Sequence, residues 1–265
     1  AIRAPRIEAA TESTRSTGAV HHTLGSMAKA RVALYFDTVS PYTHFALHTW
    51  RRYVPAIWPD VELALKPIFL GGVMQATGNQ PPGTLAARAA YMVQDLQRSA
   101  SLCDVPMLET PSNFFSEVAR KIIGVQRVLC AADLQGHSTS EKLDLACAFS
   151  DAVHAEKSLR TDSNDLALGD AFYRSALSRC PGIDGDALVT LSGSGEAKAL
   201  LRANTDAAVE NGAFGSPTAI VTRFDAQGAT QGEPMLIFGS DRFEQLAHVL
   251  ELPYRSPQPH ERARL

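Results

Sequence analysis

The chain has 265 residues, of which 45% are hydrophobic and 20% charged, and its formal net charge is −3. No run of Lys or Arg exceeds two residues, which argues against nucleic acid as a partner. The uncharged apolar runs are too short to cross a bilayer, so we expect no membrane-spanning segment. The cysteines are scattered without a Cys-x-x-Cys motif, which suits reduced thiols in an intracellular protein: Cys103, Cys130, Cys147 and Cys180.

Both ends of the chain differ in character from the rest. Residues 1–26 contain Arg, Ser and Thr and weakly resemble a mitochondrial transit peptide, whereas Gly25-Ser26-Met27 resembles a junction before a native start. We expect a flexible arm or tag there. Ala263-Arg264-Leu265 resembles a peroxisomal address, with chance as the alternative, so the expected location is peroxisomal or mitochondrial.

The first predicted element is a strand over residues 31–37, followed directly by a helix that begins at Pro41. Ser40 is predicted to cap this helix, and Pro41 suits its first position. A strand that leads straight into a helix N-terminus forms an anion site, because free N–H groups and the positive end of the helix dipole meet there. The alternative is that Ser40 only caps its helix.

A second strand is predicted over residues 61–66, giving a β-α-β unit with parallel strands. Residues 69–83 contain many Gly and Pro residues and are predicted to form a loop. Helical spacing dominates from Thr84 to Asn211, and the predicted helices cover 86–103, 113–134, 138–159, 166–178, 184–191 and 195–211.

The chain then returns to strands over 216–222 and 234–238, followed by a last helix that begins in residues 239–244. Asp241 and Glu244 have the spacing of a capping box. This order of elements predicts an α/β protein with a thioredoxin-like fold and a large all-helical insertion. The thioredoxin-like domain would comprise residues 27–84 and 212–253, the insertion 85–211 and a C-terminal tail 254–265.

The active position of a thioredoxin-like fold is the N-terminus of its first helix, where a cysteine pair usually lies. This chain has Ser40-Pro41-Tyr42-Thr43 there, so disulfide exchange is excluded at that position. A serine hydroxyl can instead donate a hydrogen bond to the thiolate of a ligand. Lowering a thiol pKa from about 8.5 to about 6.5 corresponds to roughly 2.7 kcal/mol and makes most of the thiol ionised at neutral pH.

Two further segments fit a small peptide ligand. The Ser216-Pro217 bond, just before a strand, is predicted to be cis and to expose the backbone of Ser216. The carboxylate of Asp241 suits a ligand ammonium group, and the hydroxyl of Ser240 suits a ligand carboxylate. An ordinary proline and simple helix capping are the alternatives. Together the segments describe a site for a zwitterionic peptide with a thiol.

Other constellations carry less. His44 and His48 are four residues apart on one helix, but no third ligand suggests itself, so we expect no metal. The run from Ser192 to Gly195 is not the Gly-x-Ser-x-Gly elbow of a hydrolase. No Gly-x-Gly-x-x-Gly follows a strand, which leaves no case for a dinucleotide.

From Val32 to Leu250 the chain resembles the kappa-class glutathione transferases, which are related to 2-hydroxychromene-2-carboxylate isomerases and DsbA-type oxidoreductases. The motifs that carry the resemblance are Phe36-Asp37 with Ser40-Pro41-Tyr42, Gly78-Asn79-Gln80-Pro81-Pro82-Gly83, Gly212-Ala213-Phe214-Gly215-Ser216-Pro217 and Phe238-Gly239-Ser240-Asp241-Arg242.

The resemblance implies that Ser40 stabilises the glutathione thiolate and that Ser216, beside Pro217, pairs with the cysteinyl unit. It also implies that Ser240 and Asp241 hold the γ-glutamyl end and that Pro41, Tyr42 and Asn79 line the glutathione site. Arg88 stands where the family often has a lysine for the glycine carboxylate, and the two are not equivalent in geometry. His44 stands where the family often has an aromatic residue, and Ser216 stands where it has a larger apolar residue. Both differences concern the electrophile pocket, so the second substrate is left unassigned.

The expected activity is that of a detoxifying glutathione transferase, in which thiolate attacks a hydrophobic electrophile, with a possible peroxidase side activity. Glutathione is the expected co-substrate, without a metal, and a homodimer is implied by the resemblance. Two alternatives remain open: a glutathione-dependent isomerase of chromene-type acids, and a non-catalytic glutathione-binding or chaperone-like protein.

Overall fold

The computed structural model describes residues 28–54 and 56–259. The expected N-terminal arm and the tripeptide Ala263-Arg264-Leu265 lie outside these residues. The centre of the fold is a four-stranded sheet in the order β2-β1-β3-β4, formed by β1 (Ala30–Phe36), β2 (Val61–Pro67), β3 (Thr218–Phe224) and β4 (Thr230–Phe238). β1 and β2 are parallel, which confirms the predicted β-α-β unit, whereas β3 and β4 are antiparallel to their neighbours.

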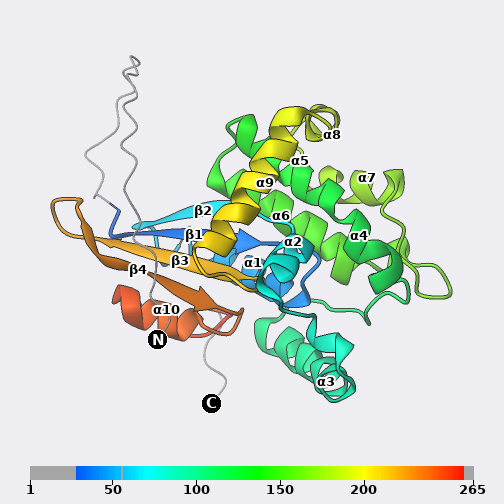
Figure 1. Cartoon of the computed structure of the whole chain (residues 1–265), viewed down its shortest axis with the longest axis horizontal. Coiled ribbons are helices and arrows are strands. Elements are labelled where there is room, and N and C mark those ends of the chain that lie inside the picture. The colour runs from blue at the N-terminus through cyan, green and yellow to red at the C-terminus, as the bar shows by residue number, and fades with distance from the viewer. Residues whose placement is uncertain (1–27, 55, 260–265) are drawn as a thin grey trace.

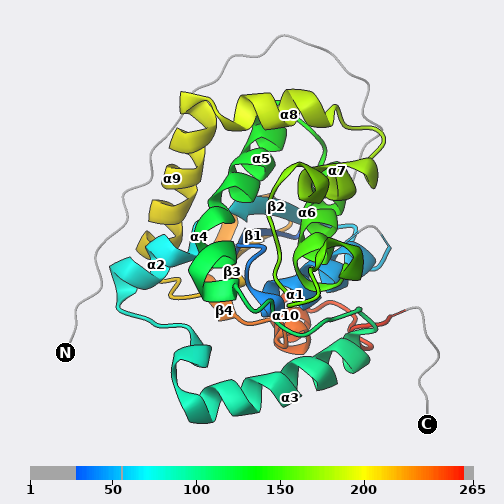
Figure 2. The same cartoon turned by 90° about the vertical axis from the view of Figure 1, so that its right-hand side faces the viewer.

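Helices surround this sheet and fill the sequence between β2 and β3. They are α1 (Pro41–Tyr53), α2 (Leu70–Thr77), α3 (Ala86–Cys103), α4 (Ala119–Lys121), α5 (Ile123–Leu134), α6 (Thr139–His154), α7 (Asp170–Ser178), α8 (Gly185–Ser192), α9 (Gly195–Glu210) and α10 (Phe243–Leu250). Figure 1 shows α4 to α8 gathered at one end of the sheet, and Figure 2 shows α3 lying apart from that group. The thioredoxin-like fold with a helical insertion is confirmed.

The core is divided by the sheet. Leu34 of β1 faces the large cluster that includes Trp50 of α1 and Phe243 of α10. Tyr35, the next residue along, faces the other side, where Ile68 and residues of α9 pack. Successive side chains of a strand point to opposite faces, so β1 is covered on both. This double burial fixes the position of the chain where β1 ends.

The predicted loop at residues 69–83 is partly wrong, because α2 lies within it. Gly71 and Gly72 are poor helix formers, yet a Cβ on Gly71 would lie 2.8 Å from the ring of Phe69. The N–H of Leu70 donates to the carboxylate of Asp37, and Val73 is fully buried. Tertiary packing therefore overrides the low helix propensity of the segment.

Other predicted boundaries also shift. The predicted helix 113–134 is broken into a π-helical turn (Phe114–Val118), α4 and α5, and the predicted helix 138–159 ends at His154. The capping-box prediction for Asp241 is wrong: α10 begins after Arg242, without a side-chain cap. Ser138 and Glu141 do form a capping box, at the start of α6.

The segment after α10 folds back onto α1. The Trp58 ring N–H donates to the carbonyl of Pro253 at 2.8 Å, and the Tyr53 hydroxyl donates to the carbonyl of Ser256 at 2.7 Å. The four cysteines are buried and unpaired, as expected for reduced thiols. Among the described residues no helix is both long and apolar enough to span a membrane.

Candidate functional site

Ser40 lies at the junction of β1 and α1 and caps α1, as predicted. Its Oγ accepts the N–H of Thr43 at 3.3 Å, and Pro41 occupies the first turn. The same Oγ donates to the carbonyl of Ser216 at 2.9 Å, across 176 positions of sequence. The junction is therefore fixed to the segment before β3, and the N–H of Tyr42 has no acceptor within the described residues.

Ser216 and Pro217 form the opposite wall of this junction, and the bond between them is cis, as predicted. The Oγ of Ser216 accepts the N–H of Asp37 at 2.9 Å and lies 2.8 Å from Oγ1 of Thr43. The Ser216 carbonyl is occupied by Ser40, while no acceptor for its N–H occurs in the described part of the chain. The Ser216 side chain therefore points into the junction.

Asp37 lies directly beneath Ser40 and was not singled out as a site residue by the sequence. Its carboxylate accepts the N–H groups of Val39 and Leu70, and the side-chain amide of Gln126, at 2.9 to 3.0 Å. The group is fully buried, and burial raises its pKa from 3.8 to about 6, although the three hydrogen bonds act in the opposite direction. Its sequence signals were its place at the end of a strand and its place in the Phe36-Asp37 motif, neither of which assigned it a role.

Tyr42 connects the junction to α3. Its hydroxyl donates to Oδ2 of Asp95 at 2.9 Å. Burial, together with this carboxylate, holds the pKa of Tyr42 well above its ordinary value of 10, so the phenol keeps its proton. Asp241 also contributes to that shift, which places it within electrostatic range of Tyr42.

Asn79 and Arg88 belong to the segment of α2 and α3, and only Asn79 contacts the junction. The side-chain amide of Asn79 donates to the carbonyl of Phe214 at 2.7 Å, two residues before Ser216. Arg88 lies in the first turn of α3 and is exposed. The structure thus brings Asn79 to the predicted site, whereas no hydrogen bond or ion pair between Arg88 and the site exists in the described residues.

Ser240 and Asp241 follow β4 on the other side of Pro217. The N–H of Gly239 donates to the carbonyl of Pro217 at 3.0 Å, and Gly239 has a φ of 108°, a conformation that favours glycine. The carboxylate of Asp241 is exposed and pairs with Arg242 at 3.0 Å. Neither Ser240 nor Asp241 caps α10.

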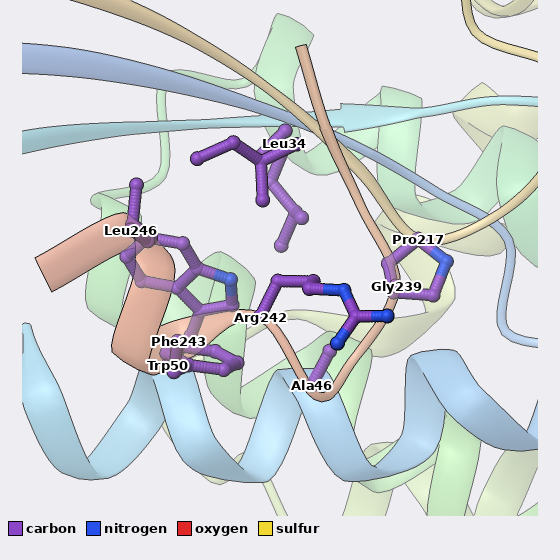
Figure 3. A pocket seen from close by; sticks show the side chains of 10 residues that line it. Leu34, Ala46, Trp50, Pro217, Gly239, Arg242, Phe243 and Leu246 are labelled. Atoms are coloured by element: carbon purple, nitrogen blue, oxygen red, sulfur yellow. The ribbon is translucent and has the colours of Figure 1, made fainter. Parts of the chain in front are cut away.

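A small cavity lies beneath Pro217 and Gly239 (Figure 3). Its volume is about 10 Å³, room for one water molecule at most, and its lining is apolar apart from Arg242. It is a packing gap between the sheet, α1 and α10. The candidate site is instead the surface around the β1–α1 junction, where Ser40, Ser216 and Pro217 are in contact and Ser240 and Asp241 follow on.

The comparisons with known proteins agree with this arrangement. The family model for the DSBA-like thioredoxin domain matches residues 31–251. Glutathione S-transferase kappa 1 of Caenorhabditis elegans is 30% identical over 86% of this chain and 93% of its own length. The rat protein of the same name is 28% identical over 85% and 93%.

The chain belongs to the DSBA-like thioredoxin-domain family and, within it, to the kappa-class glutathione S-transferases. The solved structure of a 2-hydroxychromene-2-carboxylate isomerase is 20% identical, covers 83% of this chain and 94% of its own, and has a TM-score of 0.64. A probable DsbA oxidoreductase of Streptomyces coelicolor is 15% identical, with coverage of 83% and 88% and a TM-score of 0.54. These two similarities show that the chain shares the fold of both proteins.

Proposed function

We propose that this protein is a glutathione transferase in which Ser40 and the N-terminus of α1 hold the bound glutathione as a thiolate. The observation that carries this proposal is the position of the Ser40 hydroxyl at the positive end of the α1 dipole, where the N–H of Tyr42 has no acceptor among residues 28–54 and 56–259. Hydrogen-bond donors and a positive dipole favour the ionised form of a thiol. The curated relatives named glutathione S-transferase kappa support the same activity.

Each of the remaining site residues would bind a different part of glutathione. The N–H of Ser216, beside cis-Pro217, would bind the cysteinyl backbone, and the exposed carboxylate of Asp241 would bind the γ-glutamyl ammonium. Ser240 would bind the γ-glutamyl carboxylate, Asn79 would border the peptide, and Arg88 would attract the glycine carboxylate. Catalysis then comes from thiol ionisation and proximity, without a covalent enzyme intermediate or a catalytic metal.

The electrophile in this proposal is hydrophobic. The rings of Phe214 and Phe238 lie 4.4 Å apart and are 41% and 39% exposed. Gly215 lies under the ring of Phe238, next to Ser216. This apolar surface borders the proposed glutathione site and supports an apolar second substrate. Peroxide reduction is the proposed side activity.

The deciding experiment is a pH titration of the ultraviolet thiolate absorbance of glutathione bound to the protein. We expect a midpoint well below that of free glutathione. We expect Ser40→Ala to raise this midpoint and, at a pH below it, to reduce turnover far more than binding. Ser194→Ala is a matched control, because Ser194 caps α9 in the same way, far from the junction in sequence. An unshifted midpoint with tight binding would favour a non-catalytic glutathione-binding protein.

A thiol assay separates conjugation from isomerisation. Conjugation consumes one thiol for each electrophile, whereas a glutathione-dependent isomerase of chromene-type acids leaves the thiol concentration unchanged. Loss of free thiol with 1-chloro-2,4-dinitrobenzene is the expected result. Isomerisation without such loss would replace the transferase proposal.

Assembly and location belong to the same proposal. We propose a homodimer, which light scattering would test, and a monomer at working concentration would reject it. We also propose a peroxisomal location through Ala263-Arg264-Leu265, with mitochondria as the alternative. A fluorescent fusion at the N-terminus, compared with the same fusion lacking the last three residues, tests the address.

A further inference from the structure

Two helices bring two histidines and an aspartate together on the side of α1 that faces α6. Nε2 of His48 lies 2.8 Å from Oδ1 of Asp151, and Nδ1 of His44 lies 3.8 Å from the same oxygen. One nitrogen of each ring and one carboxylate oxygen all lie within 4.8 Å of one another. His44 is fully buried, whereas His48 and Asp151 reach solvent.

The surroundings of His44 fix which of its nitrogens is free to bind a cation. Its Nε2 lies 2.9 Å from the carbonyl of Pro106, which can only accept, so Nε2 carries the hydrogen. Nδ1 is then left with a lone pair directed at Ser150, whose Oγ lies 3.0 Å away, and toward Asp151. A backbone carbonyl that holds the far nitrogen is the usual support of a metal-binding histidine.

The charges around the group also suit a cation. Arg179 lies 3.2 Å from Oδ2 of Asp151 and leaves Oδ1 to the histidines. The guanidinium of Arg179 is paired in addition with Glu156, so the two carboxylates and one guanidinium sum to a charge of −1.

We propose that Nδ1 of His44, Nε2 of His48 and Oδ1 of Asp151 bind a divalent transition-metal ion, zinc in preference to harder cations. Two nitrogens and one carboxylate oxygen are a typical zinc donor set, and water or the nearby Ser150 hydroxyl supplies the fourth tetrahedral position. Bonds of about 2.0–2.2 Å require ligand atoms about 3.3–3.5 Å apart. The two observed separations lie on either side of that range.

The metal is structural in this proposal. It joins α1, whose N-terminus carries Ser40, to α6, and it lies outside the proposed glutathione site. Binding replaces the hydrogen bond between His48 and Asp151. Nε2 of His48 then presents its lone pair to the metal, and the neutral ring carries its hydrogen on Nδ1 instead. The proposal stands apart from the transferase activity, because it predicts a stabilised helix pair and no change in chemistry.

The test is a titration of the full chain, first freed of metal by a chelator, with cobalt chloride and then with zinc chloride. We expect one equivalent of Co²⁺ to give the visible absorption of a tetrahedral site, zinc to displace it, and zinc to raise the melting temperature. His48→Gln and Asp151→Asn should each weaken binding at least tenfold. His48 is partly exposed, so its variant keeps the test valid if Asp151→Asn fails to fold.

The chain also offers a matched control, because His21 and His22 are adjacent in the sequence and could bind metal independently. The double variant His21→Gln with His22→Gln should keep the site intact. The proposal is overturned if Co²⁺ gives no tetrahedral spectrum, if His48→Gln binds as tightly as the natural chain, or if only the double variant loses binding.

Discussion

The buried carboxyl group of Asp37 makes a quantitative prediction about stability and pH. Its pKa is about 6 in the folded protein and 3.8 in a solvated chain, so the folded state binds more protons between these values. Stability from this group is fully present below the unfolded pKa and is lost as the pH rises through the folded pKa. The shift corresponds to about 3 kcal/mol in total.

The perturbation is Asp37→Asn, which removes the titration. Its amide also leaves at least one of the facing N–H groups without an acceptor, which costs about 1–3 kcal/mol at every pH. That offset cancels when the two proteins are compared across pH. The stability of Asp37→Asn relative to the natural chain should therefore rise by about 2 kcal/mol from about pH 4.5 to about pH 7.5.

Urea unfolding followed by tryptophan fluorescence measures this difference, because Trp50 and Trp58 are both buried in the fold and become exposed on unfolding. The comparison is needed because burial lowers the pKa of His44 and His154, which makes stability rise with pH over part of the same range. A constant difference between the two proteins across the range would refute the raised pKa. A difference that falls with pH would refute its sign.

Three more predictions concern separate parts of the chain. Gly239→Ala should destabilise the fold by more than about 1 kcal/mol, because its φ of 108° is one that side-chain-bearing residues rarely adopt. It should also raise the KM for glutathione, because the new Cβ would lie 2.7 Å from the carboxylate of Asp241 and displace it; steady-state kinetics and melting test this. Ser138→Ala should cost about 1 kcal/mol in urea unfolding, through loss of the α6 capping box, without a change in KM. The four buried cysteines should react with a thiol reagent only after denaturation.

The fold could be predicted from the sequence because the order of its elements is diagnostic and their periods are clear. The prediction failed at α2, where the hydrogen bond from Leu70 to Asp37 and the burial of Val73 outweigh the low helix propensity of the two glycines. It failed again at Asp241, because capping-box spacing does not reveal that the carboxylate pairs with Arg242 instead. A local pattern limits the structures that a residue can adopt, but it does not show which contacts form in the folded chain.

The site was predicted in part for the same reason. The Ser40-Pro41 pair predicted the cap of α1, and the resemblance placed Ser40 in the same site as Ser216, 176 positions away. The roles of Asp37 and Asp151 depend on contacts that no spacing rule reports: Gln126 is 89 positions from Asp37, and Asp151 is 103 from His48. The sequence analysis found no third ligand for the histidine pair because the one proposed above, Asp151, is distant in sequence.

The hydroxyl of Ser40 has one proton and two candidate acceptors, the carbonyl of Ser216 and the sulfur of bound glutathione. In the structure the Ser40 hydroxyl donates to the Ser216 carbonyl, with an oxygen–oxygen distance of 2.9 Å. A charged acceptor forms a hydrogen bond roughly twice as strong as a neutral one. An ionised sulfur should therefore accept the hydrogen bond from Ser40, and a neutral thioether should not.

This difference isolates the role of the serine. Ser40→Ala should weaken the binding of glutathione at about pH 8, where the bound thiol is ionised, by about tenfold, the equivalent of about 1.4 kcal/mol. It should leave the binding of S-methylglutathione unchanged within about twofold, since in that complex the Ser40 hydroxyl donates to the carbonyl of Ser216 and not to the ligand. Calorimetry with both ligands measures the two effects. Equal weakening would mean that Ser40 acts only as the cap of α1, because a distorted helix terminus affects both ligands alike.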